Sequence, residues 1–574
     1  MSIRSRWAAR AAILALAALG TALVRDHQRL DSATMDEPFH ALASAEYAIS
    51  GTAWANLEHP PLVKLLAGVC EAYAGARAPS IPLPFSYRTA ETPVHFTFSN
   101  VLDGDRLLQA GRFPFPILFF VLVVAAAETA VRRLGPLAGI AVALLLAFEP
   151  TMVAHAAFLH TDVAAALGYF GATLGTLAAL ERGSWLSWAA AGAALGLLLA
   201  AKFSGVFLVP ILVLVVLVWV LRDGGRPWWE RCRPLAGLIL AAAVSAGIVL
   251  AAGAVATRAM SRTDAEQSVR LFLKSRSVPD GRIESVASLS RLCPAAGHYA
   301  AGLVGVAAQN RSGGGVNVLR GKLSVEGFPE YFLVAFLVKS SLGLLLLLAL
   351  VLVVALARRE RLSRLEAVVL APALYLFVSG TGASYNIGVR HMLPAVPLLL
   401  LAAASLLVRA APGAAVPALL VCGVLQAGET LAVHPHELSF FNLAAGGPAR
   451  GETWLNDSNV DWGQDLVRLA RGLPALGIDE SALTVAYFGG DSPGYRLPRA
   501  RLFDPLAGEV APGLWAVSSY LLAEGPEALA WRGQLRAAAG YQRLREEAAR
   551  GERIGRVGYS IHLLRIAGRE GATK

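Results

Sequence analysis

The chain has 574 residues, of which 55% are hydrophobic and only 16% are charged. Soluble domains average about a quarter charged residues, so this composition excludes an ordinary multidomain soluble protein. The formal net charge is +10 at pH 7. Much of the arginine lies in short clusters between apolar runs, where it sets membrane topology, and we expect no nucleic-acid partner.

The first 432 residues consist largely of apolar runs that are candidate bilayer spans. The first run follows Arg4, Arg6 and Arg10 and lacks a small-residue cleavage site, so we interpret it as an uncleaved span rather than a signal peptide. Basic residues gather in alternate connections, and the positive-inside rule places those connections and the N-terminus in the cytoplasm. The pattern predicts eleven spans, at 8–24, 113–131, 136–154, 162–180, 185–201, 204–221, 234–256, 331–357, 366–380, 392–408 and 413–432.

Three long connections would then lie on the extracytoplasmic side, at 25–112, 257–330 and 433–574. The first contains residues 62–74, whose pattern is typical of an interfacial amphipathic helix. The sequence therefore predicts an all-α polytopic membrane domain over residues 1–432, followed by a small extracytoplasmic α/β domain. In that second domain we expect strands at 483–488, 514–518 and 557–564 and helices at 463–473 and 527–539.

Carboxylates and basic groups gather in the first outer connection. Asp36, Glu37 and His40 come soon after the first span, and His59 and Lys64 flank a Pro-Pro pair further on. Acid–base groups at this level could act on a substrate that carries a lipid tail. The alternative is a solvated loop with a proline turn.

Five more candidates lie at or near the predicted span ends. An ionisable group beside hydrocarbon is a functional candidate, although Asp162 could simply cap its helix and Lys202 could snorkel to the surface. Topology does not require Arg390 and the adjacent His391 on the outer side, so we expect an anionic ligand there. Lys339 falls inside an apolar run and needs a partner, either a lipid phosphate or an acidic side chain.

Two further features leave alternatives open. Residues 456–466 hold three aspartates and a tryptophan, which could bind a sugar or a metal, but a helix-capping turn is favoured. The four cysteines show no metal-ligand spacing. Cys70 and Cys293 would lie on the same side of the membrane and could pair, although free thiols are the favoured interpretation.

The pattern Asp36-Glu37…His40, followed by His59-Pro60-Pro61-Leu62…Lys64, resembles the first luminal loop of protein O-mannosyltransferases. Their bacterial relatives include the aminoarabinose transferases and the phospholipid-carrier-dependent glycosyltransferases, which the segments at 160–162, 386–394 and 434–466 resemble. These are GT-C enzymes that use polyprenyl-phosphate sugars. The chain departs from the aminoarabinose transferases because His59 replaces the lysine before Pro-Pro. It also lacks the large outer insert of the eukaryotic enzymes and has a middle loop and a C-terminal α/β domain in its place, so acceptor choice does not carry over.

The resemblance implies an inverting transfer of a sugar from polyprenyl phosphate to an acceptor hydroxyl on a protein, lipid or glycan outside the cytoplasm. It makes Asp36 the general base, Glu37 its neighbour and Asp162 a second acidic site residue. The candidates for binding substrate or phosphate are His59, Lys64, Lys202, Lys339, Arg390 and His391. A divalent cation could bind Asp36, Glu37, His59 and Asp162, but no metal is the favoured expectation.

The chemistry agrees with this resemblance. A sugar phosphate has a good leaving group, so cations that hold the phosphate and one carboxylate base are enough. The alternatives are a transporter or flippase for lipid-linked sugars and a non-catalytic membrane scaffold. A transporter would place its polar residues near mid-membrane, whereas here most lie at the outer rim. We expect the protein in a bacterial inner membrane, among membrane lipids.

Overall fold

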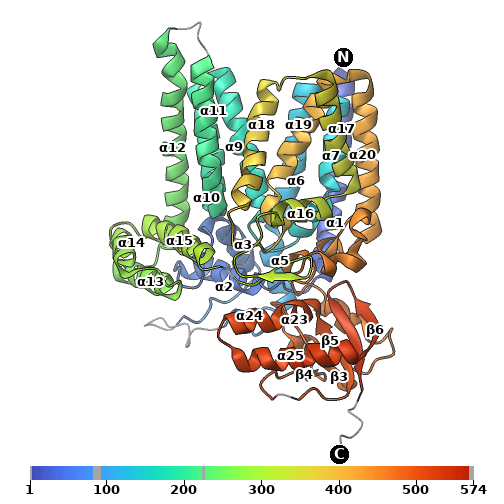
Figure 1. Ribbon diagram of the computed structural model, residues 1–574. Helices are drawn as coiled ribbons and strands as arrows, with labels where there is room; N and C mark the ends of the chain where they lie inside the picture. Colours follow the sequence, from blue (N-terminus) through green and yellow to red (C-terminus); the bar gives the residue numbers. More distant parts are fainter. Residues whose placement is uncertain (1–2, 82–91, 223–226, 314, 508, 568–574) are drawn as a thin grey trace, which may run out of the picture.

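The computed structural model describes residues 3–81, 92–222, 227–313, 315–507 and 509–567. A bundle of long helices stands on one side of the molecule, and a smaller unit that contains a β-sheet lies at one end of it (Figure 1). The fold is that of a polytopic helical membrane protein with a small C-terminal sheet, as the sequence predicted. The connection between the predicted spans at 204–221 and 234–256 falls partly outside the described residues.

Most helices of the bundle follow the predicted spans, but the predicted spans at 136–154 and 331–357 are each divided into two helices. Those before residue 260 are α1 (Ile3–Leu30), α2 (Glu37–Ala45), α3 (Pro61–Tyr73), α4 (Pro93–Phe98), α5 (Gly104–Arg112), α6 (Pro114–Leu134), α7 (Pro136–Ala147), α8 (Pro150–His155), α9 (Asp162–Arg182), α10 (Trp185–Ala201), α11 (Leu208–Arg222) and α12 (Trp228–Ala256). Those after it are α13 (Arg262–Ser275), α14 (Asp280–Leu292), α15 (Pro294–Arg311), α16 (Tyr331–Lys339), α17 (Leu342–Arg358), α18 (Arg364–Gly380), α19 (Ala395–Ala410) and α20 (Pro412–Val433).

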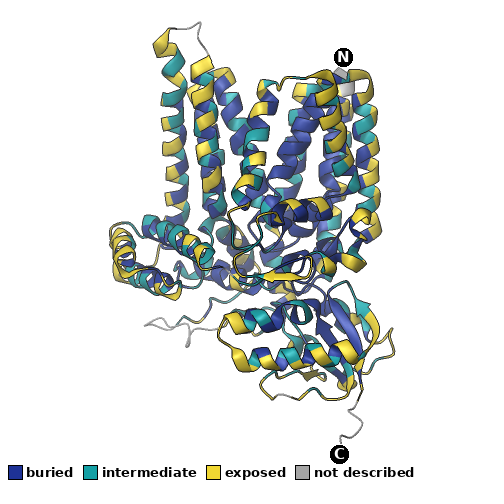
Figure 2. Cartoon of the chain, viewed as in Figure 1, coloured by how far each residue is buried: buried dark blue, intermediate teal, exposed yellow. Residues whose placement is uncertain are grey.

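The predicted number of eleven spans remains a prediction. Within the described residues, six helices are long and apolar enough to cross a membrane, or seven if the bent pair α16 and α17 forms one span. Shorter apolar helices, such as α7 with 12 residues, would rise only about 18 Å, less than the roughly 30 Å of a bilayer's hydrocarbon core. Outer surfaces of the long helices are exposed while their inner faces are buried (Figure 2).

The predicted span at 331–357 is broken. Its halves, α16 and α17, meet at an angle of 113°, because Ser340 is extended and the hydroxyl of Ser341 accepts a hydrogen bond from Leu344 N and so begins a new helix. The Asn442 amide donates to the carbonyl oxygens of Leu337 and Ser340. These bonds satisfy backbone groups that the break would otherwise leave unpaired inside the bundle.

The C-terminal unit is a five-stranded mixed sheet with the strand order β4-β3-β5-β7-β6. β3 pairs in parallel with β4 and β5, whereas β7 pairs antiparallel with β5 and β6. One face packs with Trp515 and Val517 against Leu544. The elements are α21 (Leu466–Gly472), β3 (Leu483–Ala486), α22 (Pro493–Arg496), β4 (Arg501–Leu502), β5 (Gly513–Ser518), α23 (Ser519–Ala523), α24 (Gly525–Trp531), α25 (Leu535–Arg550), β6 (Glu552–Val557) and β7 (Ile561–Ile566).

Two predicted elements of this unit are wrong in detail. The strand predicted at 557–564 is a hairpin turn and parts of two strands, since the chain reverses between β6 and β7 at Gly558 with φ of 55°. The helix predicted at 527–539 is two helices, separated near Gly533, which has φ of 76°. Both glycines adopt a left-handed conformation that side chains with a Cβ rarely take, and they end the preceding element.

The interfacial helix expected at 62–74 is present as α3. All four cysteines are free thiols. The C-terminal unit contacts the segment that follows α1, because Ala33 N donates to the Asp491 carboxylate at 3.1 Å and Val467 N donates to the Ser32 hydroxyl at 2.7 Å. The sheet is therefore attached to the end of the bundle that carries Asp36 (Figure 1).

Candidate active site

Asp36 lies at the N-terminal end of α2, but its side chain makes no hydrogen bond that caps the helix. Its Oδ2 instead lies 3.3 Å from the Arg390 guanidinium and 3.5 Å from His160 Nε2. The Asp36 side chain is 38% exposed, whereas those of Arg390 and His160 are 5% and 3% exposed. Asp36 is therefore the group of this cluster that a substrate can reach.

Behind His160 lies a buried ion pair. Lys202 hydrogen-bonds Asp162, and Nδ1 of His160 lies 2.9 Å from Asp162 Oδ2. Arg390 has only donors and its Nη1 lies 2.9 Å from His160 Nε2, so Nε2 accepts and the ring proton lies on Nδ1, beside Asp162. Asp162 and Lys202 thus neutralise each other and orient the imidazole that supports Arg390.

Arg390 lies in a short 3-10 helix at Val389–Met392 and is fixed from several sides. Its guanidinium carbon lies 4.4 Å from the centroid of the Trp462 ring, a cation–π arrangement. The Trp462 ring also contacts His160 and His155, at centroid distances of 5.5 and 5.8 Å. A positive group is thereby held beside Asp36 with a fixed orientation.

The environment of Asp36 keeps its carboxylate ionised. Burial alone would raise its pKa, but the charge of Arg390 outweighs burial and holds the pKa of Asp36 well below its ordinary value. A carboxylate in this state is a weak base. It becomes a stronger base if Arg390 is drawn away toward another anion.

Glu37 has different surroundings from its neighbour. It is fully buried, and Arg112 donates to its two oxygens at 2.7 and 2.6 Å. Thr34 N and Leu159 N also donate to it, both at 2.9 Å. The geometry gives Glu37 no access to a substrate, and its contacts fix the loop that carries Asp36 instead.

Lys64, predicted to bind phosphate, is completely buried. Its ammonium donates to the Tyr47 hydroxyl at 3.1 Å and to the carbonyl oxygens of His59 and Asn56. Burial lowers the pKa of Lys64 to about 7, although Glu46 opposes the shift. Lys64 thus holds the loop that presents His59.

Lys339 and His391 complete the predicted residues. The ammonium of Lys339, next to the break after α16, donates to the carbonyl oxygens of Leu438 and Asn459, both at 2.7 Å. Its partners are therefore backbone groups, whereas an acidic side chain or a lipid phosphate was expected.

His391 packs edge-on against Phe332, with ring centroids 5.9 Å apart. Burial and the nearby cations lower its pKa well below the ordinary value. The structure thus brings Asp36, His160, Asp162, Lys202 and Arg390 into one network, with Lys339 outside it.

Three histidines beside Asp36 could hold a metal. His40, His59 and His160 each offer one ring nitrogen, and these atoms lie within 4.8 Å of one another. Burial lowers the pKa of both His40 and His59, which favours the neutral form that binds cations. Three imidazoles suit an ion of the zinc class. The site expected from Asp36, Glu37 and Asp162 fits less well, since Arg112 and Lys202 already pair with two of these carboxylates.

Arg390 bears directly on that metal site. Its Nη1 donates to His160 Nε2, and Nδ1 of the same ring faces Asp162. A cation at the three histidines would therefore compete with Arg390 for the Nε2 lone pair. The two arrangements exclude each other at this atom.

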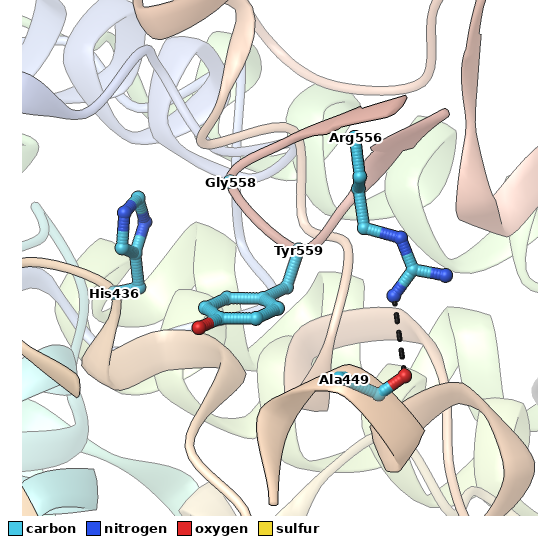
Figure 3. Close-up of a pocket in the computed structure, with 5 residues that line it drawn as sticks. All are labelled: His436, Ala449, Arg556, Gly558 and Tyr559. Atoms are coloured by element: carbon cyan, nitrogen blue, oxygen red, sulfur yellow. Dashed lines mark hydrogen bonds between the residues drawn. The ribbon is translucent and has the colours of Figure 1, made fainter. Parts of the chain in front are cut away.

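A separate surface pocket of about 520 Å³ lies at the turn between β6 and β7 (Figure 3). His436, Arg556 and Tyr559 line it, and Arg556 donates to Ala449 O at 3.4 Å. The same guanidinium already pairs with Glu452 at 2.7 Å. None of the predicted site residues lines this pocket, and its cation is neutralised.

Three residues that shape the site were not among the predicted site residues, namely His160, Trp462 and Arg112. Trp462 belongs to the polar segment 456–466, for which a structural turn was favoured, yet its ring packs on Arg390. Arg112 stands at the outer end of a predicted span, where topology does not require a basic residue. The same argument that selected Arg390 could have found it.

Comparisons with known proteins support the resemblance in part of the chain. Residues 96–250 match the model of a family described as dolichyl-phosphate-mannose-protein mannosyltransferase. The match includes His160, Asp162 and Lys202 and leaves out the first-loop motif. Among curated proteins, the comparison of sequences finds no match.

Several solved structures are similar. One is the S. cerevisiae protein O-mannosyltransferase Pmt1-Pmt2 complex bound to the sugar donor, with 18% identity and a TM-score of 0.34. The match covers 45% of the present chain and 34% of the yeast chain. The Archaeoglobus fulgidus oligosaccharyltransferase complex with Zn and sulfate shows 14% identity and a TM-score of 0.46, covering 92% and 70% of the two chains.

ArnT from Cupriavidus metallidurans in the apo state shows 14% identity and a TM-score of 0.35, covering 96% and 97% of the two chains. The match over residues 96–250 confirms the resemblance predicted from the motifs. Over these residues the chain is similar to the dolichyl-phosphate-mannose-protein mannosyltransferases.

Proposed function

We propose that this protein is an inverting glycosyltransferase that moves a sugar from a polyprenyl-phosphate donor to an acceptor hydroxyl on the outer face of a bacterial inner membrane. The observation that carries the proposal is the contact between Asp36, the accessible carboxylate, and Arg390, a buried cation fixed on Trp462 and His160. A base and a phosphate-binding group thus lie side by side near the level where the helices end.

In the proposed reaction the acceptor oxygen attacks the anomeric carbon of the sugar from the face opposite the phosphate. The carbon–oxygen bond to the phosphate breaks, a bond to the acceptor oxygen forms, and the acceptor proton passes to Asp36. Polyprenyl phosphate leaves with the electron pair. One attack from the opposite face inverts the anomeric configuration, in contrast to the double displacement of a retaining enzyme.

Arg390 would connect the two halves of this reaction. Without donor it lies against Asp36 and keeps that carboxylate weakly basic. A donor phosphate would draw the guanidinium toward itself, which leaves Asp36 free to accept a proton. As the leaving phosphate gains negative charge, Arg390 stabilises it.

The remaining residues of the network hold these two in place. His160 accepts from Arg390, and the Asp162–Lys202 pair orients His160. We assign Asp162 and Lys202 to positioning, in place of direct contact with substrate. Glu37 and Arg112 fix the segment before α2.

The proposed topology has the N-terminus in the cytoplasm and Asp36 outside. The C-terminal sheet, which contacts the segment after α1, would lie on the extracytoplasmic side with it, as a domain covering residues 433–574. The acceptor could be a protein, a lipid or a glycan.

The decisive experiment uses the purified full-length protein in lipid nanodiscs with a polyprenyl-phosphate sugar and a panel of hydroxyl acceptors. We expect polyprenyl phosphate to be released and the product to have an inverted anomeric centre by NMR. Donor that remains unchanged with every acceptor would support the scaffold alternative, and transmembrane movement of intact donor would support a flippase.

A further inference from the structure

A second pocket lies where α1 ends, beside α5 and α21. Its volume is about 370 Å³, which is within the range of small-ligand sites. Its lining includes four arginines and two glutamines. The lining residues are Arg25, Gln28, Arg29, Asp31, Asp105, Leu108, Gln109, Arg112, Val467 and Arg471.

The two acidic residues of this pocket pair with basic residues that do not line it. Asp31 pairs with Arg468 at 2.5 Å and with His27. Asp105 pairs with Arg496 at 2.5 Å. Among the described residues, neither carboxylate forms an ion pair with one of the pocket's arginines.

Three of the four arginines have no acidic partner in the part of the chain that the structure describes. Arg112 is committed to Glu37, whereas Arg25 donates only to the neutral Gln28 amide at 2.7 Å. Arg29 and Arg471 are exposed and make no ion pair among the described residues. The pocket therefore carries an excess of positive charge.

The positions of two of these arginines make this excess unfavourable in the free protein. Arg25 and Arg29 are four residues apart on α1, so their side chains lie on the same helix face and repel each other. Arg471, from α21, adds a third positive charge to the lining of the pocket. An anion between the three guanidinium groups would remove the repulsion and give each of them a charge-assisted hydrogen bond.

We propose that Arg25, Arg29 and Arg471 bind the phosphate of a lipid headgroup, at a site separate from the donor position proposed at Arg390. The location favours a lipid as the source of this phosphate. α1 is a candidate membrane span whose last turn holds Arg29, so the pocket lies at the level where lipid headgroups begin. The membrane supplies such a phosphate at high local concentration.

The test measures binding of radiolabelled phosphatidic acid to the purified full-length protein in neutral detergent, at low salt, by a scintillation proximity assay. Replacing all three arginines with glutamine (R25Q/R29Q/R471Q) should weaken binding on the order of a hundredfold, since each surface arginine contributes about a factor of five. The triple lysine variant keeps the charge and should retain most of the binding. Because the readout is lipid binding, the result does not depend on glycosyl transfer.

A matched control removes three other exposed arginines that have no ion pair among the described residues and do not line the pocket, as R106Q/R501Q/R536Q. The control should bind phosphatidic acid within about twofold of the unaltered protein. Equal loss in the two triple variants overturns the proposal, because net charge alone would then explain binding.

Two further arms identify the ligand. Phosphatidylcholine, whose phosphate carries a compensating ammonium, should compete at least about tenfold more weakly than phosphatidic acid. Inorganic phosphate should compete only weakly, and competition as strong as that of the lipid would overturn the assignment to a headgroup. A melting temperature that the glutamine variant shares with the control shows that lost binding is not lost folding.

Discussion

Asp36 and Arg390 are 354 residues apart in the chain, yet the Arg390 guanidinium lies 3.3 Å from the Asp36 carboxylate. The first loop supplies the exposed partner and the loop before α19 supplies the buried one. The pair brings a loop near the start of the helical region of the sequence into contact with a loop near its end. A small displacement of either loop would separate base from cation.

Asp36→Asn tests the proposed base. The amide keeps the shape of the side chain and cannot accept a proton, so transfer should fall by about 10² to 10⁴. Donor binding should persist, because the donor is held by Arg390. The measurement is release of polyprenyl phosphate under saturating donor and acceptor, with membrane insertion checked by yield. Full activity in this variant removes Asp36 from the mechanism, and a transporter would tolerate the change.

Arg390→Ala and Arg390→Lys test the phosphate contact. Alanine should reduce kcat/KM for donor by about 10² to 10³, the usual loss when one preorganised donor to a developing charge is removed. Lysine should recover part of that loss, because it keeps the charge but not the planar fork. The KM for acceptor should change much less. If donor kinetics are unchanged in the alanine variant, Arg390 does not bind phosphate.

The pH dependence follows from the same pair. The pKa of Asp36 is held below its ordinary value, so in the free enzyme the carboxylate is ionised at neutral pH, and the acid limb of kcat/KM due to this group should lie below about pH 4. Its depressed pKa also stabilises the folded state above the unfolded-state value, and that contribution is lost as pH falls. In Arg390→Gln the pKa of Asp36 should rise and the limb should move to higher pH. A limb at the same pH in both proteins contradicts the coupling.

Several residues of this network could be predicted from the sequence, but the contacts between them could not. Apolar runs and the alternation of arginines located the helices, because both follow directly from bilayer thickness and topology. The importance of Asp162 and Arg390 could be inferred from charge placed at the ends of predicted spans, and that of Asp36 from the acid–base groups that gather in the first outer connection. Which cation pairs with which carboxylate could not, since pairing depends on tertiary distances that no local pattern encodes.

Lys202 illustrates this limit. Its position in a tight turn at a span end favoured simple snorkelling, whereas the structure buries it against Asp162. Trp462 lies in a segment whose aspartates suggested a cap. Its role as a platform under Arg390 depends on the contact between two loops distant in sequence.

Glu37→Gln tests the support beneath the site. Removing one charge of a buried, doubly hydrogen-bonded pair leaves Arg112 uncompensated, which typically costs about 3 to 5 kcal/mol. The melting temperature in detergent should therefore fall markedly. Glu128→Gln is the control, because Glu128 also receives two hydrogen bonds from one arginine, Arg10, but its side chain is 22% exposed, so its melting temperature should fall less. Equal shifts in the two variants would show that burial does not set the cost.

Trp462→Leu and Trp462→Phe test the aromatic platform. Leucine fills part of the volume but removes the ring over which the Arg390 guanidinium lies at 4.4 Å. A cation–π contact in a desolvated site contributes up to about 2 kcal/mol, so donor KM should rise by up to roughly thirtyfold in the leucine variant. Phenylalanine keeps a smaller aromatic face and should give an intermediate value. A merely structural role predicts lower stability with unaltered donor KM in the folded fraction, so the two readouts separate orientation of Arg390 from packing.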